Sequence, residues 1–320
     1  MNTLSAYILK AMRKSYKNIW DRIELPKPDC IQEPNAAAKV IFDLLTSDKP
    51  CMIARFGSTE LTCLANYSGI YRTHQNIFGF IKGEKPPWWW DPKIISQMQQ
   101  WSGFFPPEVH KIEQFCELMI QDIPLVDVLG SWLHEEHLFA EELLSAEKIA
   151  LLFFDPFWAI HPWTKALEGK KVLVVHPFTE TIQQQYKKRE LIFENNLLPE
   201  FELKTIKAVQ SIAGATTSFA DWFEALDYMK KQIEETDFDI CLIGAGAYGF
   251  PLAAHVKRLG KKAFHIGGSL QLLFGIKGKR WESDYHNVYN YPSLFNAHWV
   301  RPKEEEKPTN AQIVEGACYW

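Results

Sequence analysis

Short apolar segments alternate along this chain with longer segments in which apolar residues recur every three or four positions. The segments typical of buried strands cover residues 51–55, 125–129, 149–154, 172–175, 203–208, 239–243 and 263–266. Helical periodicity covers residues 36–45, 111–121, 135–144, 181–193, 219–236 and 251–258. Continuous apolar strands separated by helices are typical of parallel sheets covered on both faces. The pattern predicts an α/β fold with a doubly wound, mostly parallel, Rossmann-like sheet and helices on both faces.

Residues 3–23, near the start of the chain, have an amphipathic helical pattern. One side of this helix is apolar, with Leu4, Ile8, Ala11, Met12, Ile19 and Ile23. The other side is basic, with Lys10, Arg13, Lys14 and Lys17. We favour a helix packed on the domain with its basic face in solvent, and the alternative is weak association with an anionic membrane surface.

Proline-rich and polar segments divide the chain into three parts. Prolines mark a linker over residues 26–34, and the segment KEEEKPTN after Arg301 is polar and expected to be mobile. We therefore divide the chain into an N-terminal helical extension (1–49), one α/β domain (50–301) and a polar C-terminal tail (302–320).

The most informative segment covers residues 237–281, where two strands each end in a glycine turn. Gly244, Gly246 and Gly249 follow the first of these strands, and Gly267 and Gly268 follow the second. Parallel strands joined by a helix end at the same edge of a sheet, so both turns are expected to face one crevice. A basic loop with Lys277, Lys279 and Arg280 comes next. Glycine backbone, helix N-termini and nearby cations suit a phosphate or pyrophosphate.

A dinucleotide site is disfavoured, although GAGAYG has the spacing of its glycine motif. That site expects an acidic residue at the end of the next strand, where this chain has His265 and Ile266. It also expects the motif in the first strand–helix unit of the domain, whereas here it is near the end. The alternative to any phosphate site is that the glycines only permit a tight turn and close helix packing.

Two other strand ends carry candidate polar residues. Arg55 ends the first strand, so it either pairs with a buried carboxylate or contacts a ligand phosphate. Ser58 is a candidate N-cap of the helix that follows, and Glu60 in its first turn suits the helix dipole. His176 ends the fourth strand and is a candidate acid, base or phosphate donor, although a lone histidine is more often structural. The small-residue turn over residues 214–218 is a further possible backbone contact for an anion.

Composition narrows the functional classes. The 320 residues carry a formal net charge of −4, which does not favour nucleic acid as a partner. The six cysteines are scattered, without a metal-binding spacing, as is usual in the reducing cytosol. Tryptophans at residues 88–90, Trp158, Trp163 and Trp281 could stack on bases or sugars, but tryptophan more often packs in cores.

Together these motifs resemble the GT-D-type glycosyltransferase-like proteins found around bacterial surface-polysaccharide genes. In that family the first strand ends in an Arg–aromatic–Gly–Asp–x–Glu motif, and this chain has RFGSTE at residues 55–60. The segment 244–281 resembles the GAYG…GG…FG.KGKRW signature of a subgroup. The resemblance implies a GT-D-like fold and a nucleotide-sugar donor. This chain departs from the family motif at Ser58, which stands where the motif has its aspartate. Because divalent cations prefer carboxylates, a metal ion on the diphosphate is disfavoured.

We therefore expect a cytoplasmic glycosyltransferase that transfers a sugar from a UDP-sugar to a glycan acceptor in surface-polysaccharide assembly, with a peripheral location at the membrane as an option. The alternatives are a non-catalytic nucleotide-binding scaffold and another Rossmann-like transferase such as a methyltransferase. The catalytic candidates are Glu60 and His176. The candidates for nucleotide or phosphate binding are Arg55, Gly57, Ser58, Gly244, Gly246, Tyr248, Gly249, Gly267, Gly268, Ser269, Lys277, Lys279 and Arg280.

Overall fold

The computed structural model describes residues 3–20, 28–193, 195–215, 217–283, 289–308 and 319–320. Seven strands within these residues form one sheet in the order β3-β2-β1-β7-β6-β4-β5, and all neighbours are parallel. The strands are β1 (Cys51–Ala54), β2 (Val128–Ser131), β3 (Glu147–Ala150), β4 (Lys171–His176), β5 (Glu202–Lys207), β6 (Ile240–Ile243) and β7 (Lys262–His265). The prediction of a doubly wound, parallel α/β sheet is confirmed.

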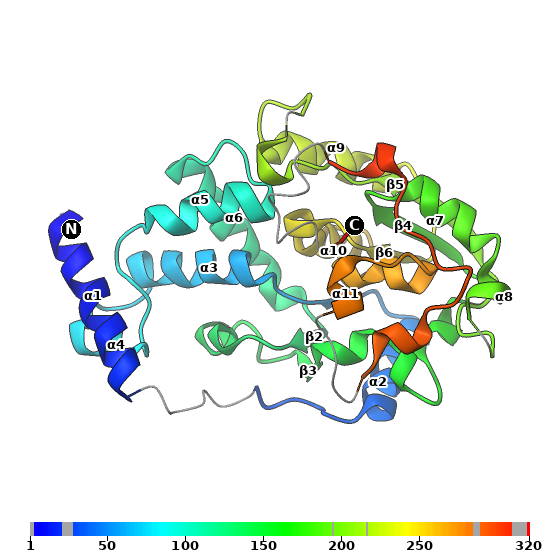
Figure 1. Ribbon diagram of the computed structural model, residues 1–320, viewed down its shortest axis with the longest axis horizontal. Helices are drawn as coiled ribbons and strands as arrows, with labels where there is room; N and C mark the ends of the chain where they lie inside the picture. The colour runs from blue at the N-terminus through cyan, green and yellow to red at the C-terminus, as the bar shows by residue number, and fades with distance from the viewer. Residues whose placement is uncertain (1–2, 21–27, 194, 216, 284–288, 309–318) are drawn as a thin grey trace.

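Helices cover both faces of this sheet (Figure 1). One face packs against α3 (Ser58–Tyr71), α5 (Pro92–Ser102), α6 (Val109–Asp122), α9 (Trp222–Glu234) and α10 (Gly249–Arg258). The other packs against α2 (Pro34–Thr46), α7 (Thr179–Tyr186), α8 (Arg189–Ile192) and α11 (Lys279–Ser283). Alternate residues of β1 enter the two cores, since Met52 and Ala54 join the first and Cys51 and Ile53 the second. This explains why the strands are continuously apolar rather than alternating.

Two elements differ from the sequence-based expectation. The expected strand at 149–154 ends at Ala150, and the apolar residues Leu151–Phe154 form a 3-10 helix instead. The expected helix at 135–144 is a 3-10 helix over His134–Phe139 followed by turns. The cause there is Glu136, whose buried carboxylate accepts hydrogen bonds from the backbone N–H groups of Trp132 and Leu133, both at 3.0 Å. These bonds tie the segment back to the end of β2.

Smaller shifts occur at other boundaries. The helix expected over 181–193 begins two residues earlier and is divided into α7 and α8. The second strand begins at Val128 rather than at residue 125, because Ile123–Leu125 form a 3-10 turn that ends α6.

The described part of the polar tail, residues 302–308, packs on the domain. Glu306 is buried, and its carboxylate accepts from the backbone N–H of Glu180 at 2.8 Å and of Thr181 at 3.4 Å. The Thr181 hydroxyl also donates to this carboxylate. Glu306 thus caps the N-terminus of α7, which has no side-chain cap of its own. The tail is held by the donors that a helix N-terminus leaves unpaired.

The N-terminal helix α1 (Thr3–Trp20) is present and packs on the protein with Lys14 and Lys17 exposed, but its apolar side also faces outward. It lies beside α4 (Ile77–Lys82), at the end of the molecule away from the sheet (Figure 1). Lys10 and Arg13 face the rest of the protein, while the apolar side of the helix is exposed. Residues 21–23 of the expected helix lie outside the described residues. Of the helices that the structure describes, none is both long enough and apolar enough to cross a membrane.

Candidate functional site

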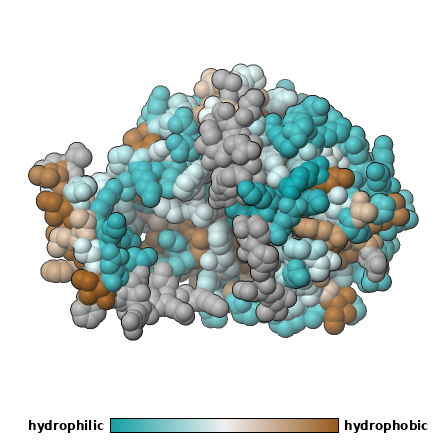
Figure 2. All heavy atoms as spheres, in the orientation of Figure 1, coloured by the Kyte–Doolittle hydropathy of each residue, from teal (hydrophilic) through white to brown (hydrophobic). Residues whose placement is uncertain are grey.

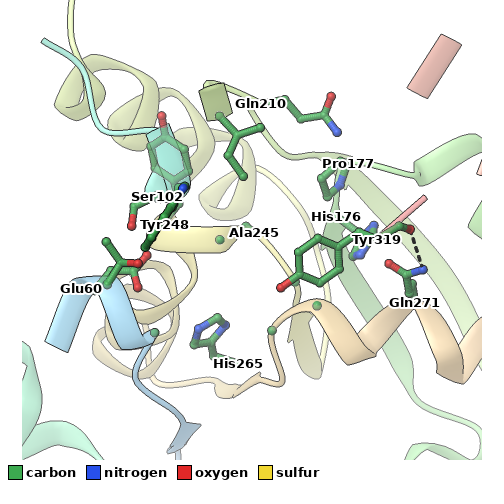
Figure 3. A pocket seen from close by; sticks show the side chains of 18 of the residues that line it. Glu60, Ser102, His176, Pro177, Gln210, Ala245, Tyr248, His265, Gln271 and Tyr319 are labelled. Carbon is green, nitrogen blue, oxygen red and sulfur yellow. Dashed lines mark hydrogen bonds between the residues drawn. The ribbon is translucent and has the colours of Figure 1, made fainter. Parts of the chain in front are cut away.

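A cleft of about 470 Å³ lies at the carboxyl ends of β1, β7, β6 and β4. The strand order changes direction between β1 and β7, and ligands of open α/β sheets bind at such a point. Eleven of the candidate residues line the cleft: Arg55, Gly57, Ser58, Glu60, His176, Gly244, Gly246, Tyr248, Gly267, Gly268 and Arg280. The expectation that both glycine turns face one crevice is therefore met (Figure 3).

The glycines in these turns have different physical roles. A Cβ at Gly244 would lie 2.6 Å from His176 Cδ2 and 2.8 Å from the Gly267 carbonyl oxygen, so close packing requires glycine there. Gly246 has φ +53° and nothing within 4 Å of a Cβ. Gly267 has φ +84°, a value that side chains disfavour. Gly246 is thus the turn position with open space in front of it.

Four of the candidates do not line the cleft. Gly249 lets α10 pack closely on β7, since its Cβ would lie 2.1 Å from His265 Cε1. The Ser269 hydroxyl is bonded to the buried carboxyl of Asp155. Lys277 lies 3.8 Å from the carboxylate of Glu282. Lys279 begins α11, where its backbone N–H donates to the carbonyl of Trp320 at 3.4 Å. Of the three basic loop residues, only Arg280 reaches the cleft.

Arg55 lies where the first strand leaves the sheet. Its Cδ would be 3.5 Å from a Cβ at Gly267, so the side chain passes beside the second glycine turn. Its guanidinium carbon is 5.1 Å from the ring centroid of Trp132, within the range of a cation–π contact. Trp132 is fixed in turn, because its indole N–H donates to the Phe56 carbonyl at 3.1 Å. These contacts hold a positive charge between β1 and β7.

The N-terminus of α3 differs slightly from expectation. Gly57 is the N-cap rather than Ser58, and Ser58 is the first helical residue. Glu60 lies in the first turn as expected, and a Cβ at Gly57 would be 1.7 Å from Glu60 Oε2. The Glu60 carboxylate therefore folds back over the N-terminus of its own helix and faces the cleft (Figure 3). The helix dipole favours a carboxylate at this position.

Two buried histidines, His176 and His265, lie beneath the cleft and carry their single ring proton on different nitrogens. The Phe178 backbone N–H donates to His176 Nδ1 at 3.0 Å, so the proton of His176 is on Nε2. His265 Nδ1 donates to the Ile243 carbonyl at 3.3 Å, which leaves its Nε2 as an acceptor. Burial lowers the pKa of His176 to about 3. Burial, then the charge of Arg55, lowers the pKa of His265 to about 3. Both rings are therefore neutral near pH 7, one a donor and the other an acceptor.

This protonation state predicts a pH effect on stability. The pKa of His176 is about 3 when folded, below its ordinary value of 6.5, so the unfolded chain binds more protons between these values. Its contribution is complete above pH 6.5 and is lost as the pH falls. Between pH 7 and pH 5, we expect the free energy of unfolding to fall by about 2 kcal/mol less in His176→Asn than in the wild type. The asparagine oxygen can still accept the Phe178 N–H.

The measurement is urea unfolding of both proteins at the two pH values. Burial raises the pKa of Asp122 and Asp155 to about 6, so these two carboxyl groups make the protein more stable as the pH falls. Their effect is present in both proteins and cancels in the comparison. Equal pH dependence in both proteins would show that the pKa of His176 in the folded protein is close to its ordinary value.

Several residues of the cleft were not identified from the sequence. The exposed tryptophans that line it are Trp101 and Trp132, whereas Trp163 and Trp281 are buried in the core. Tyr319 also lines it: Arg280 donates to its hydroxyl at 3.0 Å, and Gln271 donates to its carbonyl at 3.1 Å (Figure 3). A histidine at a strand end could have pointed to His265, but no sequence signal marks the others.

Tyr248, one of the residues taken from the glycine motif, is largely buried beneath the cleft. Its ring stacks on Trp222 at 4.8 Å, and its hydroxyl lies 3.0 Å from Ser211 Oγ. Because Ser211 Oγ donates to the Gly103 carbonyl at 2.6 Å, the tyrosine hydroxyl is the donor to serine. Burial raises the pKa of Tyr248. The residue therefore anchors the glycine turn to α9 and the loop after α5.

The described side chains do not form a metal site around Glu60. No group of three or more His, Cys, Asp or Glu residues in the described part of the chain could hold an ion. Asp127 accepts from the Met52 N–H and pairs with Lys257 at 2.7 Å. Asp155 accepts from the Tyr291 hydroxyl at 2.5 Å. Neither lines the cleft, so Glu60 has no second carboxylate from these two positions.

No protein-family model matches this chain, and no curated protein matches it significantly. Among solved structures it is similar to a domain of unknown function, number 1792, described as having a distinct glycosyltransferase fold. That similarity has a TM-score of 0.41 and 11% identity, over 93% of this chain and 96% of the other. The geometry of the cleft therefore carries the functional inference.

Proposed function

We propose that this protein is a glycosyltransferase that transfers a sugar from a nucleotide-sugar donor. The observation that carries the proposal is the meeting of two glycine turns, two arginines and one carboxylate in a single cleft at the strand ends. The cleft volume of about 470 Å³ lies within the usual range for small-molecule sites. A donor that combines an anionic diphosphate with a polar sugar matches this mixture of groups.

The donor diphosphate would bind along the glycine turns. Gly246 and Gly268 line the cleft, where their backbone N–H groups would donate to the phosphates, and Arg55 and Arg280 supply positive charge. His176 Nε2–H adds a neutral donor. We propose that it orients a phosphoryl oxygen rather than shuttling a proton, because its pKa of about 3 keeps it neutral. Charge on the departing diphosphate would be stabilised by groups already in place.

Glu60 is the proposed catalytic carboxylate. It lines the same cleft as the glycine turns, and an acceptor hydroxyl needs a base within hydrogen-bond reach. Trp101 and Trp132, exposed by 43% and 41%, offer flat surfaces for the base or for a sugar. We propose a UDP-sugar as donor and a glycan of surface-polysaccharide assembly as acceptor. We propose that nucleotide binding does not require a divalent ion, since the described residues form no metal-binding group with Glu60.

Calorimetry with UDP, GDP and S-adenosylmethionine tests the proposal. We expect UDP to bind, in a chelator as well as without one, and S-adenosylmethionine not to bind. Preference for S-adenosylmethionine would indicate a methyltransferase, which needs no phosphate site. Binding of no nucleotide would remove the proposal.

A further prediction separates a transferase from a non-catalytic binding protein. Glu60→Gln keeps the shape of the side chain but removes its charge. We expect it to leave UDP affinity within about threefold and to slow sugar release from a UDP-sugar by at least about 100-fold, a typical contribution of general base catalysis. The readout is UDP production with a range of UDP-sugars. UDP binding without turnover in the wild-type protein would favour the scaffold.

A further inference from the structure

The apolar side of α1 faces away from the protein. Its exposed large side chains are Leu4, Tyr7, Ile8, Met12 and Ile19. Figure 2 shows strongly hydrophobic residues along the edge of the molecule that α1 forms. Helices of soluble proteins normally turn such a stripe toward the core. Here the stripe lies on the surface and is large enough to be a contact site.

Polar contacts hold α1 in this orientation. Lys10 Nζ lies 2.8 Å from Asp91, and the Arg13 guanidinium carbon is 4.9 Å from the ring centroid of Phe80. Phe80 belongs to α4, the helix that packs against α1. The contacts of Lys10 and Arg13 therefore hold α1 with its apolar side facing outward. The neighbouring α4 also exposes Ile77 and Phe78, which extends the apolar surface at this end of the protein.

Charge indicates what this surface contacts. The helix contains four basic residues and no acidic one. Lys14 and Lys17 are exposed, and they line a cleft of about 600 Å³ between α1 and the rest of the protein. Lys85 and Lys93 line the same cleft, together with three acids, Glu84, Asp91 and Glu135. Cations therefore predominate directly behind the apolar stripe.

We propose that α1 binds this protein to the surface of an anionic lipid bilayer. The helix would lie in the plane of the membrane, with the apolar stripe among the upper acyl chains and the lysines at the level of the headgroup phosphates. Its 18 residues span about 27 Å, enough to bury the whole stripe. A second copy of the chain is a poorer partner for this surface. Its own α1 would bring the same cations and no carboxylate to pair with them.

Sedimentation with vesicles tests this interface. Vesicles of phosphatidylcholine alone are compared with vesicles of equal parts phosphatidylcholine and phosphatidylglycerol. We expect the wild-type protein to prefer the anionic vesicles. Ile19→Glu should weaken this binding by at least about tenfold, since it replaces an apolar side chain that the bilayer would bury. The matched control is Ile160→Glu, because Ile160 is 78% exposed and Ile19 is 74% exposed. The control should bind as the wild type does.

The lysines give a second, independent arm. Lys14→Gln with Lys17→Gln should reduce binding to anionic vesicles by roughly 30-fold and leave the weak binding to neutral vesicles unchanged. Circular dichroism checks that each variant keeps its helices. The proposal fails if the wild type binds neither vesicle, or if Ile19→Glu binds as well as Ile160→Glu. It also fails if light scattering finds a dimer that Ile19→Glu dissociates, since a second copy would then cover the stripe.

Discussion

Gly246→Val is expected to weaken UDP binding by at least roughly 100-fold, about 2.7 kcal/mol, while the protein remains folded. Gly246 lines the cleft, and a Cβ there meets no atom within 4 Å, so the branched side chain would occupy the space proposed for phosphate. Its φ of +53° also disfavours valine, at a cost of roughly 1–2 kcal/mol in stability. Calorimetry and thermal unfolding measure the two effects separately.

Gly169→Val is the matched control for this experiment. Gly169 is exposed, has φ +68°, and likewise has nothing within 4 Å of a Cβ, but it lies outside the cleft. The two variants should therefore lose similar stability, and only Gly246→Val should lose UDP. Unchanged UDP affinity in folded Gly246→Val would mean that the ligand does not approach this turn.

Arg280→Ala is expected to weaken UDP binding by about 10- to 100-fold, because a hydrogen bond to a charged group is worth about 1.5–3 kcal/mol. Uridine has no phosphate. Its affinity should therefore change by less than about threefold if Arg280 donates a charge-assisted hydrogen bond to the phosphate of UDP. Arg280 lines the cleft, where it is held by the Tyr319 hydroxyl at 3.0 Å. Comparing UDP with uridine isolates the phosphate contact.

Lys277→Ala provides the control, since Lys277 belongs to the same basic loop but does not line the cleft. It should leave both affinities unchanged. If Arg280 serves only to anchor Tyr319, its variant would lose thermal stability and keep the ratio of UDP to uridine affinity. That result would rule out Arg280 as a phosphate ligand.

The convergence of the strand ends could be predicted because it follows from topology. Once the strands are parallel, Arg55, His176, Gly244 and Gly267 must lie along one edge of the sheet. The stretch at 151–154 could not be assigned correctly, because an apolar run reports burial and not backbone shape. Likewise the carboxylate of Glu136 competes with helix formation through contacts that periodicity does not contain.

The walls of the cleft were harder to predict than its floor. Trp101, Trp132 and Tyr319 come from segments that are far apart in the sequence, so no local pattern brings them together. The outward-facing apolar side of α1 was missed for a related reason. Amphipathicity shows that a helix has two sides, but only contacts such as Lys10 with Asp91 decide which side faces the protein.

The cap formed by Glu306 has a consequence for where a ligand's negative charge can lie. Four strand-to-helix junctions open on the cleft, and two already hold a carboxylate of the protein: Glu306 at α7 and Glu60 at α3. Each of these carboxylates lies at the positive end of its helix dipole, where a ligand anion would otherwise be favoured. The junctions after β6 and β7, at Gly246 and Gly268, remain. Because β6 and β7 are neighbours in the sheet, we expect the proposed diphosphate to bind at these two adjacent junctions rather than at α3 or α7, where a carboxylate would repel it.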